Sequence, residues 1–237
     1  MTSSKKQKSF KKILQWSLKL LLKLALILIV LTMVQVAILR FIDPPCTARH
    51  LLIWYQNKFS SKHYIRPHYY WQPINKISPH LKKAVLAGED QRFLSHHGFD
   101  FIEMNQAVRD IVRAKRMRGA STITMQVARS VFLLPGGSWL RKTVEAYYTV
   151  LIELFWSKKR ILEIYLNTVD WGTGLMGAEA ASRKYFNISA IQINPSQAAC
   201  LAAILPSPHK WSPTNPSDYV KERQKRIMED MKKMPKL

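Results

Sequence analysis

Paired acids followed by two histidines form the first group of residues that could do chemistry. The segment runs Gly88-Glu89-Asp90-Gln91-Arg92-Phe93-Leu94-Ser95-His96-His97-Gly98. Because a predicted helix ends at Glu89, its dipole would raise the pKa of this carboxyl toward the range of a general base. A solvated turn ending in His97 and Gly98 explains the same residues without catalysis. Metal binding is less favoured, because adjacent histidines point in different directions and no third ligand is evident.

Hydroxyl residues between two arginines form a second group. It runs from Arg118 through Ser121 and Thr122 to Arg129. The free amides at the start of a helix attract anions, and here the hydroxyls and the arginines would assist. An ordinary serine N-cap, which is the commoner arrangement, is the alternative. In either case Ser121 is expected to cap a helix that continues to about Leu133.

A third group places an acid one helical turn beyond two cations. Glu145 follows Arg141 by four residues and Lys142 by three, so either pair can form on one helix face. A surface ion pair worth less than about 1 kcal/mol is the alternative. Farther along, Glu153 lies within the apolar run Val150–Trp156. It must be paired or functional, because burying an unpaired charge is costly.

Between the second and third groups, apolar residues flank the glycine pair Gly136-Gly137. They are Val131–Pro135 on one side and Trp139 and Leu140 on the other. Core packing and a membrane-dipping element explain this pattern about equally well.

The composition limits the class of protein. The chain has 237 residues, 37 Lys and Arg against 15 Asp and Glu, and a formal net charge of +22. With 47% hydrophobic and 11% aromatic residues it can fill a core, which excludes a mainly disordered or collagen-like chain. Cys46 and Cys200 are too few for a disulfide scaffold or a cysteine zinc site. The positive charge favours anionic partners such as nucleic acid, lipid headgroups or phosphorylated substrates.

The first forty residues contain lysines and one arginine but no acid. Within them, residues 13–39 form an apolar stretch, and a membrane-spanning helix needs about 20 such residues. The positive-inside rule places residues 1–12 in the cytoplasm and the rest of the chain outside. A cleaved signal peptide is the alternative. It is less favoured, because the stretch is long and residues 40–45 offer no small-x-small cleavage site.

The remaining signals are mainly helical. Residues 40–77, rich in aromatics and proline, are expected to form an irregular lead-in near the membrane surface. Caps at Ser78, Asp100, Ser121, Ser138 and Asn194, together with apolar spacing, predict helices over about 79–89, 101–118, 122–133, 139–156, 158–167, 175–186 and 195–205. These would build a domain over residues 78–212, followed by a basic tail over 213–237 that forms a solvated or headgroup-facing helix. No alternating run long enough for a sheet occurs, so the predicted fold class is mainly α.

Taken in order, five motifs resemble those of the family 51 glycosyltransferases, and most closely the monofunctional biosynthetic peptidoglycan transglycosylases. The first, E-D-x-x-F-x-x-H-x-G, is matched by Glu89, Asp90, Phe93, His96 and Gly98. The second, G-x-S-T-I-T-x-Q, is matched by Gly119, Ser121, Thr122, Ile123, Thr124 and Gln126, and the third, R-K-x-x-E, by Arg141, Lys142 and Glu145. The fourth and fifth lie at 161–167 and 174–186. The match covers about residues 75–212.

This resemblance implies a lysozyme-like helical catalytic domain with a small membrane-contacting jaw, preceded by one transmembrane helix. It also implies an enzyme of the bacterial inner (cytoplasmic) membrane, with its catalytic domain outside the cytoplasm. That enzyme would polymerise lipid II into β-1,4 glycan strands, with inversion and release of undecaprenyl diphosphate. Its partners would be lipid II, the growing glycan chain, membrane lipids and other cell-wall synthesis proteins. Nucleic acid is not expected, because the domain lies outside the cytoplasm.

The resemblance also implies roles for single residues. Glu89 matches the family's general base, and Glu145 would position cations or hold a divalent ion such as Mg²⁺ or Mn²⁺. The implied substrate-binding residues are Asp90, Phe93, His96, Gly98, Arg118, Ser121, Thr122, Gln126, Arg129, Arg141 and Lys142. The four cations among them would neutralise the diphosphate, a leaving group that needs positive charge more than a proton. Three positions depart from the common pattern: Met125 replaces glutamine, Arg129 replaces lysine, and Gly137 replaces an arginine.

Two other classes of function remain open. A lytic, lysozyme-like hydrolase needs an acid that protonates a glycosidic oxygen, but it needs neither a diphosphate-binding cation cluster nor a membrane anchor. A non-enzymatic, membrane-tethered scaffold would bind anionic lipid through its basic surface and would not depend on Glu89.

Overall fold

The computed structural model describes residues 2–59, 65, 67–113 and 120–235, with side chains from residue 12 onward. It divides the chain into two units, Met1–Ile42 and Asp43–Leu237. The first unit contains the helix α1 (Thr2–Leu39). Within α1, Lys12–Leu39 contains an 18-residue window with a mean hydropathy of 2.6 and is long and apolar enough to cross a membrane. This agrees with the stretch predicted at residues 13–39.

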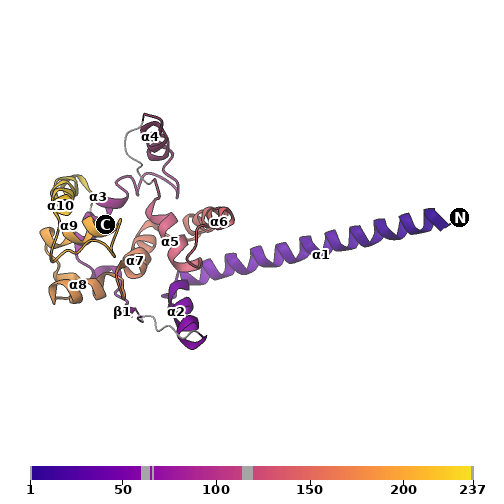
Figure 1. Ribbon diagram of the computed structural model, residues 1–237, viewed down its shortest axis with the longest axis horizontal. Helices are drawn as coiled ribbons and strands as arrows, with labels where there is room; N and C mark the ends of the chain where they lie inside the picture. The colour runs from indigo at the N-terminus through magenta and orange to yellow at the C-terminus, as the bar shows by residue number, and fades with distance from the viewer. Residues whose placement is uncertain (1, 60–64, 66, 114–119, 236–237) are drawn as a thin grey trace. The chain divides into compact units, whose positions relative to one another are not determined.

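The second unit is mainly helical, as predicted. Its elements are α2 (Ala48–Phe59), β1 (His68–Tyr69), η1 (Ile74–Lys76), α3 (Pro79–Glu89), α4 (Phe101–Val112), α5 (Ile123–Phe132), α6 (Trp139–Phe155), α7 (Lys158–Thr168), β2 (Asp170–Gly172), β3 (Leu175–Met176), α8 (Ala178–Phe186), η2 (Ala190–Gln192), α9 (Pro195–Ile204), α10 (Asp218–Asp230) and η3 (Met231–Lys233). Figure 1 shows α4 projecting away from the other helices of this unit.

Four helices begin where their capping residues predict. The Ser78 hydroxyl caps α3 with Pro79 in the first turn, and the Asp100 carboxylate accepts hydrogen bonds from two amides at the start of α4. Ser138 caps α6, and Asn194 forms a capping box with Gln197 at the start of α9. Each cap satisfies amides that have no partner within the helix, so these boundaries depend on local sequence.

Four predicted elements differ from the structure. The helix expected over 101–118 ends at Val112, with Arg113 as its C-cap. Helix α5 is capped by Thr122 and not by Ser121, so it begins one residue later than expected. The lead-in is not irregular throughout, because residues 48–59 form α2. The helix expected from Leu175 begins only at Ala178, since Leu175–Met176 is a strand.

That strand is the middle of a three-stranded sheet in the order β1-β3-β2. β1 pairs with it in parallel, with His68 opposite Leu175, and β2 pairs with it in antiparallel register. The sheet therefore fastens the lead-in to the rest of the unit. Gly177, with φ +85°, ends the hairpin, and a Cβ there would lie 2.6 Å from the Asn167 carbonyl oxygen. Only glycine fits this close approach.

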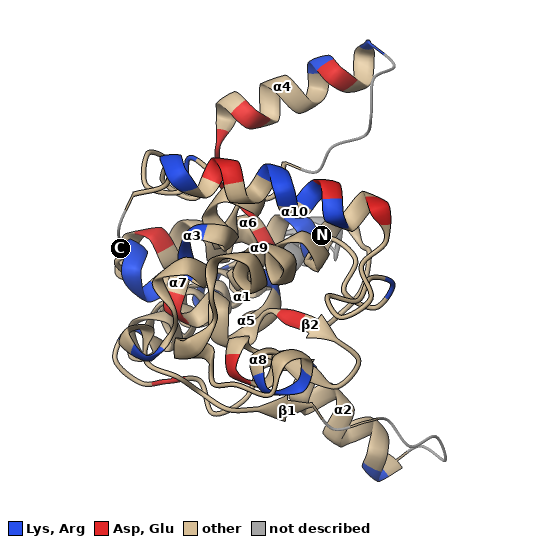
Figure 2. Cartoon of the chain, turned by 90° about the vertical axis from the view of Figure 1, so that its left-hand side faces the viewer, with Lys and Arg blue, Asp and Glu red and all other residues tan. Residues whose placement is uncertain are grey.

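The core is built around α9, whose alanines allow α3 and α10 to pack closely on it (Figure 1). Cys200 on α9 is a buried free thiol that donates to the Pro213 carbonyl, as a core residue would. The expected solvated tail is instead part of this core, because Val220 and Ile227 on α10 are buried. Most of the other positions of α10 carry Lys, Arg, Asp or Glu (Figure 2).

Candidate active site

Glu89 is the last residue of α3 and lies against two other helices. Its Oε2 accepts a hydrogen bond from Gln126 Nε2 at 3.0 Å, and its Oε1 lies 3.5 Å from Arg223 Nη2. The side chain is only 13% exposed. Burial raises the pKa of Glu89, while the Gln126 hydrogen bond and the Arg223 charge lower it and Asp90 raises it further. Burial is the largest of these effects, so the carboxyl titrates above its ordinary range.

Arg223 was missed by the sequence analysis, which placed it in a solvated tail. Its guanidinium donates to the Gly88 carbonyl oxygen at 3.0 Å as well as reaching Glu89. The contact spans 134 residues of sequence, so no local pattern predicts it. One signal was available: Val220 and Ile227 are seven residues apart, which is the spacing of one buried helix face, and Arg223 lies between them on that face.

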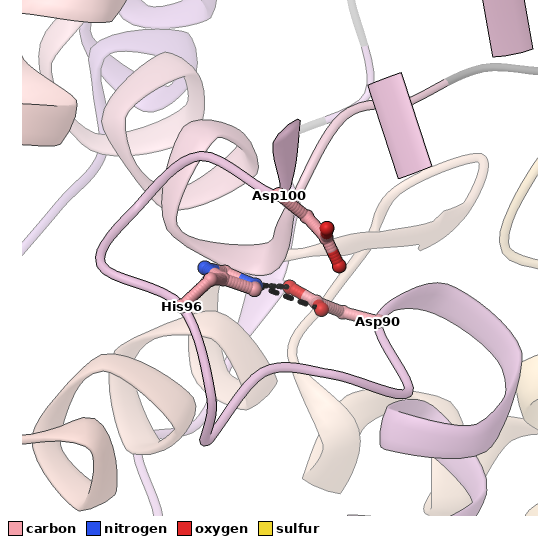
Figure 3. Close-up of side chains that lie close together, drawn as sticks. All are labelled: Asp90, His96 and Asp100. Atoms are coloured by element: carbon pink, nitrogen blue, oxygen red, sulfur yellow. Dashed lines mark hydrogen bonds and ion pairs between the residues drawn. The ribbon is translucent and has the colours of Figure 1, made fainter. Parts of the chain in front are cut away.

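Asp90 and His96 form a buried pair directly after Glu89 (Figure 3). His96 Nε2 lies 3.0 Å from Asp90 Oδ1 and 3.1 Å from Oδ2. Asp90 Oδ2 also accepts the amide of Ile123, the first residue of α5. These contacts tie the loop after α3 to the start of α5.

Gly98 and Thr122 make a second tie between the same segments. The Thr122 hydroxyl donates to the Gly98 carbonyl oxygen at 2.6 Å and accepts the amide of Met125 as the helix cap. This long-range bond explains why Thr122 and not Ser121 is the cap. Gly98 has φ +88°, and a Cβ there would lie 2.8 Å from the Thr149 methyl and 3.0 Å from Glu153 Cγ. The motif therefore requires glycine for a packing reason.

The other predicted residues of the first two motifs have simpler surroundings. Phe93 is 1% exposed, and Lys158 Nζ lies 4.5 Å from its ring centroid. Ser121 is half-buried ahead of the cap. Arg118 and Gly119 lie outside the described residues. Substrate binding by each of these residues stays a prediction.

Glu145 on α6 is buried, at 1% exposure, and forms ion pairs with two cationic side chains. Lys142 Nζ lies 2.7 Å from its Oε1, and Arg129 Nε lies 3.7 Å from its Oε2. The pair with Lys142 that the spacing predicts is therefore present, together with one to Arg129 that spacing within one helix could not predict. Arg141 instead donates to the Leu134 carbonyl oxygen.

Helix α5 connects the two glutamates. Gln126 bonds to Glu89 and, through its Oε1, accepts the Tyr165 hydroxyl at 3.3 Å. Arg129, three residues later, reaches Glu145. Residues three apart lie on one helix face, so one turn of α5 presents an amide to the first acid and a guanidinium to the second. The structure thus brings together Glu89, Gln126, Arg129, Lys142 and Glu145.

Comparison with known proteins decides the family. The model of the family described as "Transglycosylase" matches residues 58–232. The chain belongs to this transglycosylase family.

Relatives in several bacteria are named biosynthetic peptidoglycan transglycosylase. One from Caulobacter vibrioides is 44% identical over 208 residues, covering 88% of each chain. One from Pseudomonas putida is 48% identical over 203 residues, covering 86% of each chain. One from Bacteroides thetaiotaomicron is 49% identical over 166 residues, covering 70% of this chain and 67% of the relative.

The family match includes α10, since it extends to residue 232. The helix that brings Arg223 to Glu89 is therefore part of the transglycosylase domain as the family model defines it. Glu153, the other acid singled out from the sequence, is paired as expected: it accepts Thr124 Oγ1 at 2.6 Å and Lys158 Nζ at 2.8 Å.

The residues of this transglycosylase that the structure describes do not present a fitting set for a divalent ion. Glu145 has both oxygens directed at cationic side chains. Among the described residues, one close group of three suitable donors occurs, Asp90, His96 and Asp100 (Figure 3). There Asp90 already accepts from His96 and from α5, and Asp100 caps α4 with Arg92 Nε 3.1 Å away. A guanidinium beside Asp100 repels a second cation, so this group of three is also a poor site for a metal ion.

Proposed function

We propose that this transglycosylase polymerises lipid II into peptidoglycan glycan strands, with Glu89 as the general base. The chain belongs to a family of peptidoglycan glycosyltransferases. The observation that supports the proposed role of Glu89 is the surroundings of its carboxyl group. This group is a nearly buried carboxyl whose pKa is raised, held by one amide donor and near one guanidinium. A carboxyl in such a site takes up a proton more readily than an exposed one.

In the proposed reaction, Glu89 removes the proton from a sugar hydroxyl of lipid II. The hydroxyl oxygen then bonds to the anomeric carbon of the growing strand, and the bond from that carbon to the diphosphate breaks. Undecaprenyl diphosphate leaves with the bonding electrons, while the proton stays on Glu89. Attack from the face opposite an α-linked leaving group gives the β-1,4 linkage. The Gln126 amide fixes Glu89 Oε2, and Oε1 lies on the side of Arg223.

The cations near Glu145 suit the leaving group. The Lys142 side chain is 59% exposed although its ammonium is paired, and the Arg129 side chain is 39% exposed. Both can therefore contact an anion while Glu145 holds them in place. Arg141, on the same first turn of α6, adds a third positive charge. Preorganised charges of this kind stabilise a departing diphosphate in the transition state. A divalent ion at Glu145 would have to displace one of the two cations that it holds.

A lytic hydrolase is less well supported. An inverting glycosidase needs a second carboxylate to activate water, and a retaining one needs it as the nucleophile. The other described acids linked to α5 already have partners. Glu145 has both oxygens directed at cations, Asp90 accepts from His96 and the Ile123 amide, and Glu153 accepts from Thr124 and Lys158. Each is therefore poorly placed for either role.

The proposed location is the inner membrane, with α1 as a single-pass anchor, residues 1–12 in the cytoplasm and the catalytic unit outside. Exposed apolar side chains of the catalytic unit support contact with lipid. Trp139 is 90% and Leu140 is 73% exposed beside the glycine pair, and α4 exposes Phe101 at 72% and Val112 at 79%. Core packing of the element around Trp139 is thereby disfavoured. We assign these surfaces to the membrane-contacting jaw.

The test supplies the full-length protein with lipid II and, separately, with finished peptidoglycan. Formation of polymer from lipid II, and no release of fragments from peptidoglycan, is expected. Fragment release without polymer would establish the hydrolase instead. An unchanged cellular role for Glu89→Gln would favour the scaffold.

A further inference from the structure

Helix α2 carries an exposed apolar face that none of the roles described above uses. Its large side chains Leu51, Trp54, Tyr55 and Phe59 are 53–65% exposed. They follow the spacing i, i+3, i+4 and i+8, which places them on one side of the helix. Tyr55 and Phe59 contact each other with ring centroids 4.8 Å apart, and Lys58 Nζ lies 5.1 Å from the Trp54 ring. The four side chains and Lys58 therefore form one continuous patch.

The opposite face of α2 is fastened to the catalytic unit. His50 packs edge-on against Tyr69 of β1 with ring centroids 5.0 Å apart, and Arg49 forms an ion pair with Asp170 of β2. The helix also packs against α5. These contacts fix the rotation of α2 about its axis. The apolar face of α2 therefore points away from the catalytic unit.

The composition of α2 and its position in the chain favour a lipid surface as the partner that covers its apolar face. Residues 48–59 contain Arg49 and Lys58 but no acid, which suits anionic headgroups. Tryptophan and tyrosine are enriched at the membrane–water interface, and lysine can extend toward headgroups while its stem stays in the apolar layer. α2 begins nine residues after the end of α1, so a chain of that length can extend about 30 Å at most. If α1 spans the bilayer, α2 lies within reach of its surface.

We propose that α2 is an interfacial helix that seats the catalytic unit on the bilayer through Leu51, Trp54, Tyr55 and Phe59. This proposal rests on the proposed membrane anchoring and extends it. In Figures 1 and 2, α2 and α4 lie at opposite ends of the catalytic unit, so the α2 face is a separate contact from the jaw. Since α2 packs on α5, which carries Gln126 and Arg129, its seating sets the height of those side chains above the headgroups.

The direct test places a fluorescent label on the face and brominated lipid in the bilayer. The full-length protein, in a Cys46→Ser and Cys200→Ala background, receives an environment-sensitive label at Leu51→Cys or Tyr55→Cys. A matched control carries the label at Met228→Cys on α10, which is 38% exposed. In proteoliposomes of mixed neutral and anionic lipid at low protein density, we expect bromolipid to quench both α2 labels and to leave the α10 label unchanged.

Labels on α2 that stay bright and water-exposed in lipid alone would overturn the proposal. If they lose exposure only at high protein density, the occupant is a second copy of the chain, which also overturns it. Lipid II polymerisation measured on the same proteoliposomes separates this result from the proposed function, because a chain can polymerise with unquenched labels or fail to polymerise with quenched ones.

A second arm measures the consequence for activity. The double variant Leu51→Glu with Tyr55→Glu is expected to lower the polymerisation rate in proteoliposomes several-fold. In detergent the rate should be unchanged, because there is no bilayer surface for α2 to bind. Ile191→Glu with Met228→Glu adds the same charge at exposed apolar positions elsewhere. Equal losses for the two double variants in proteoliposomes would contradict a specific seat at α2.

Discussion

The two glutamates that α5 links, Glu89 and Glu145, differ in how their charge is compensated. Glu89 has an uncharged amide on one oxygen and a guanidinium at 3.5 Å from the other, and its pKa is raised chiefly by burial. Glu145 has a lysine at 2.7 Å and an arginine at 3.7 Å. A buried carboxylate with little compensation takes up a proton more readily than an exposed one. Both oxygens of Glu145, in contrast, are engaged with Lys142 and Arg129. The comparison therefore assigns proton transfer to Glu89 and cation placement to Glu145.

The largest effect is expected from Glu89→Gln. Loss of a general base should lower the polymerisation rate by about 10²–10⁴-fold, with lipid II still bound. Because the pKa of Glu89 is raised on folding, its charged form costs stability as pH rises through that pKa. At neutral pH the glutamine variant should therefore melt at the same temperature as the wild type or higher. Rate and melting temperature are measured on one preparation, and a variant that loses activity by unfolding would show a lower melting temperature.

A smaller loss is expected from Glu145→Gln, because the base remains while Lys142 and Arg129 lose their anchor. Misplaced charges should lower the turnover number by about a hundredfold. Turnover and the Michaelis constant for lipid II are measured together. The acid side of the pH–rate profile should stay at the wild-type pH, because it reports the pKa of Glu89. A shift of the acid side in Glu145→Gln would contradict the division of roles between the two glutamates.

Arg223→Met should change the pH profile more than the maximal rate. The Arg223 charge lowers the pKa of Glu89, so its removal raises that pKa and moves the acid side of the profile to higher pH. Arg226→Met on the same helix is the matched control, because Arg226 is exposed. Both profiles are recorded with lipid II. Equal profiles for the two variants would remove Arg223 from the surroundings of the base.

Gly98→Ala is expected to change the polymerisation rate least of these variants and to lower the free energy of unfolding clearly. A side chain at φ +88° that collides with Thr149 should cost about 1–3 kcal/mol. Gly137→Ala is the control, since among the described residues no atom comes within 4 Å of a Cβ there. It should change stability by less than about 0.5 kcal/mol. Thermal melting compares the two, and equal shifts would mean that Gly98 is not needed for packing.

Sequence patterns predicted the helix starts well because caps are local. Ser78, Asp100, Ser138 and Asn194 each bond to amides within three residues. The choice between Ser121 and Thr122 could not be predicted, since it depends on a bond from Thr122 to Gly98, 24 residues away. Strands of two or three residues leave no alternating pattern, so the sheet was missed as well.

The site was predicted in part for the same reason. The pair of Lys142 with Glu145 spans one helical turn and follows from spacing. The contacts of Glu89 with Gln126 and Arg223 span 37 and 134 residues and arise from the tertiary fold, which brings the end of α3 to side chains of α5 and α10. Resemblance to the family placed Gln126 in the site without giving its partner, and it placed Arg223 nowhere.

The central claim is that Glu89 accepts the proton, and the pH dependence of lipid II polymerisation tests it most directly. The wild-type rate should fall on the acid side at a pH above the ordinary range of a glutamate, because burial raises the pKa of Glu89. The slow residual reaction of Glu89→Gln should show no such fall. A Glu89→Gln variant that keeps the wild-type rate, or that keeps the same acid-side fall, would contradict the account.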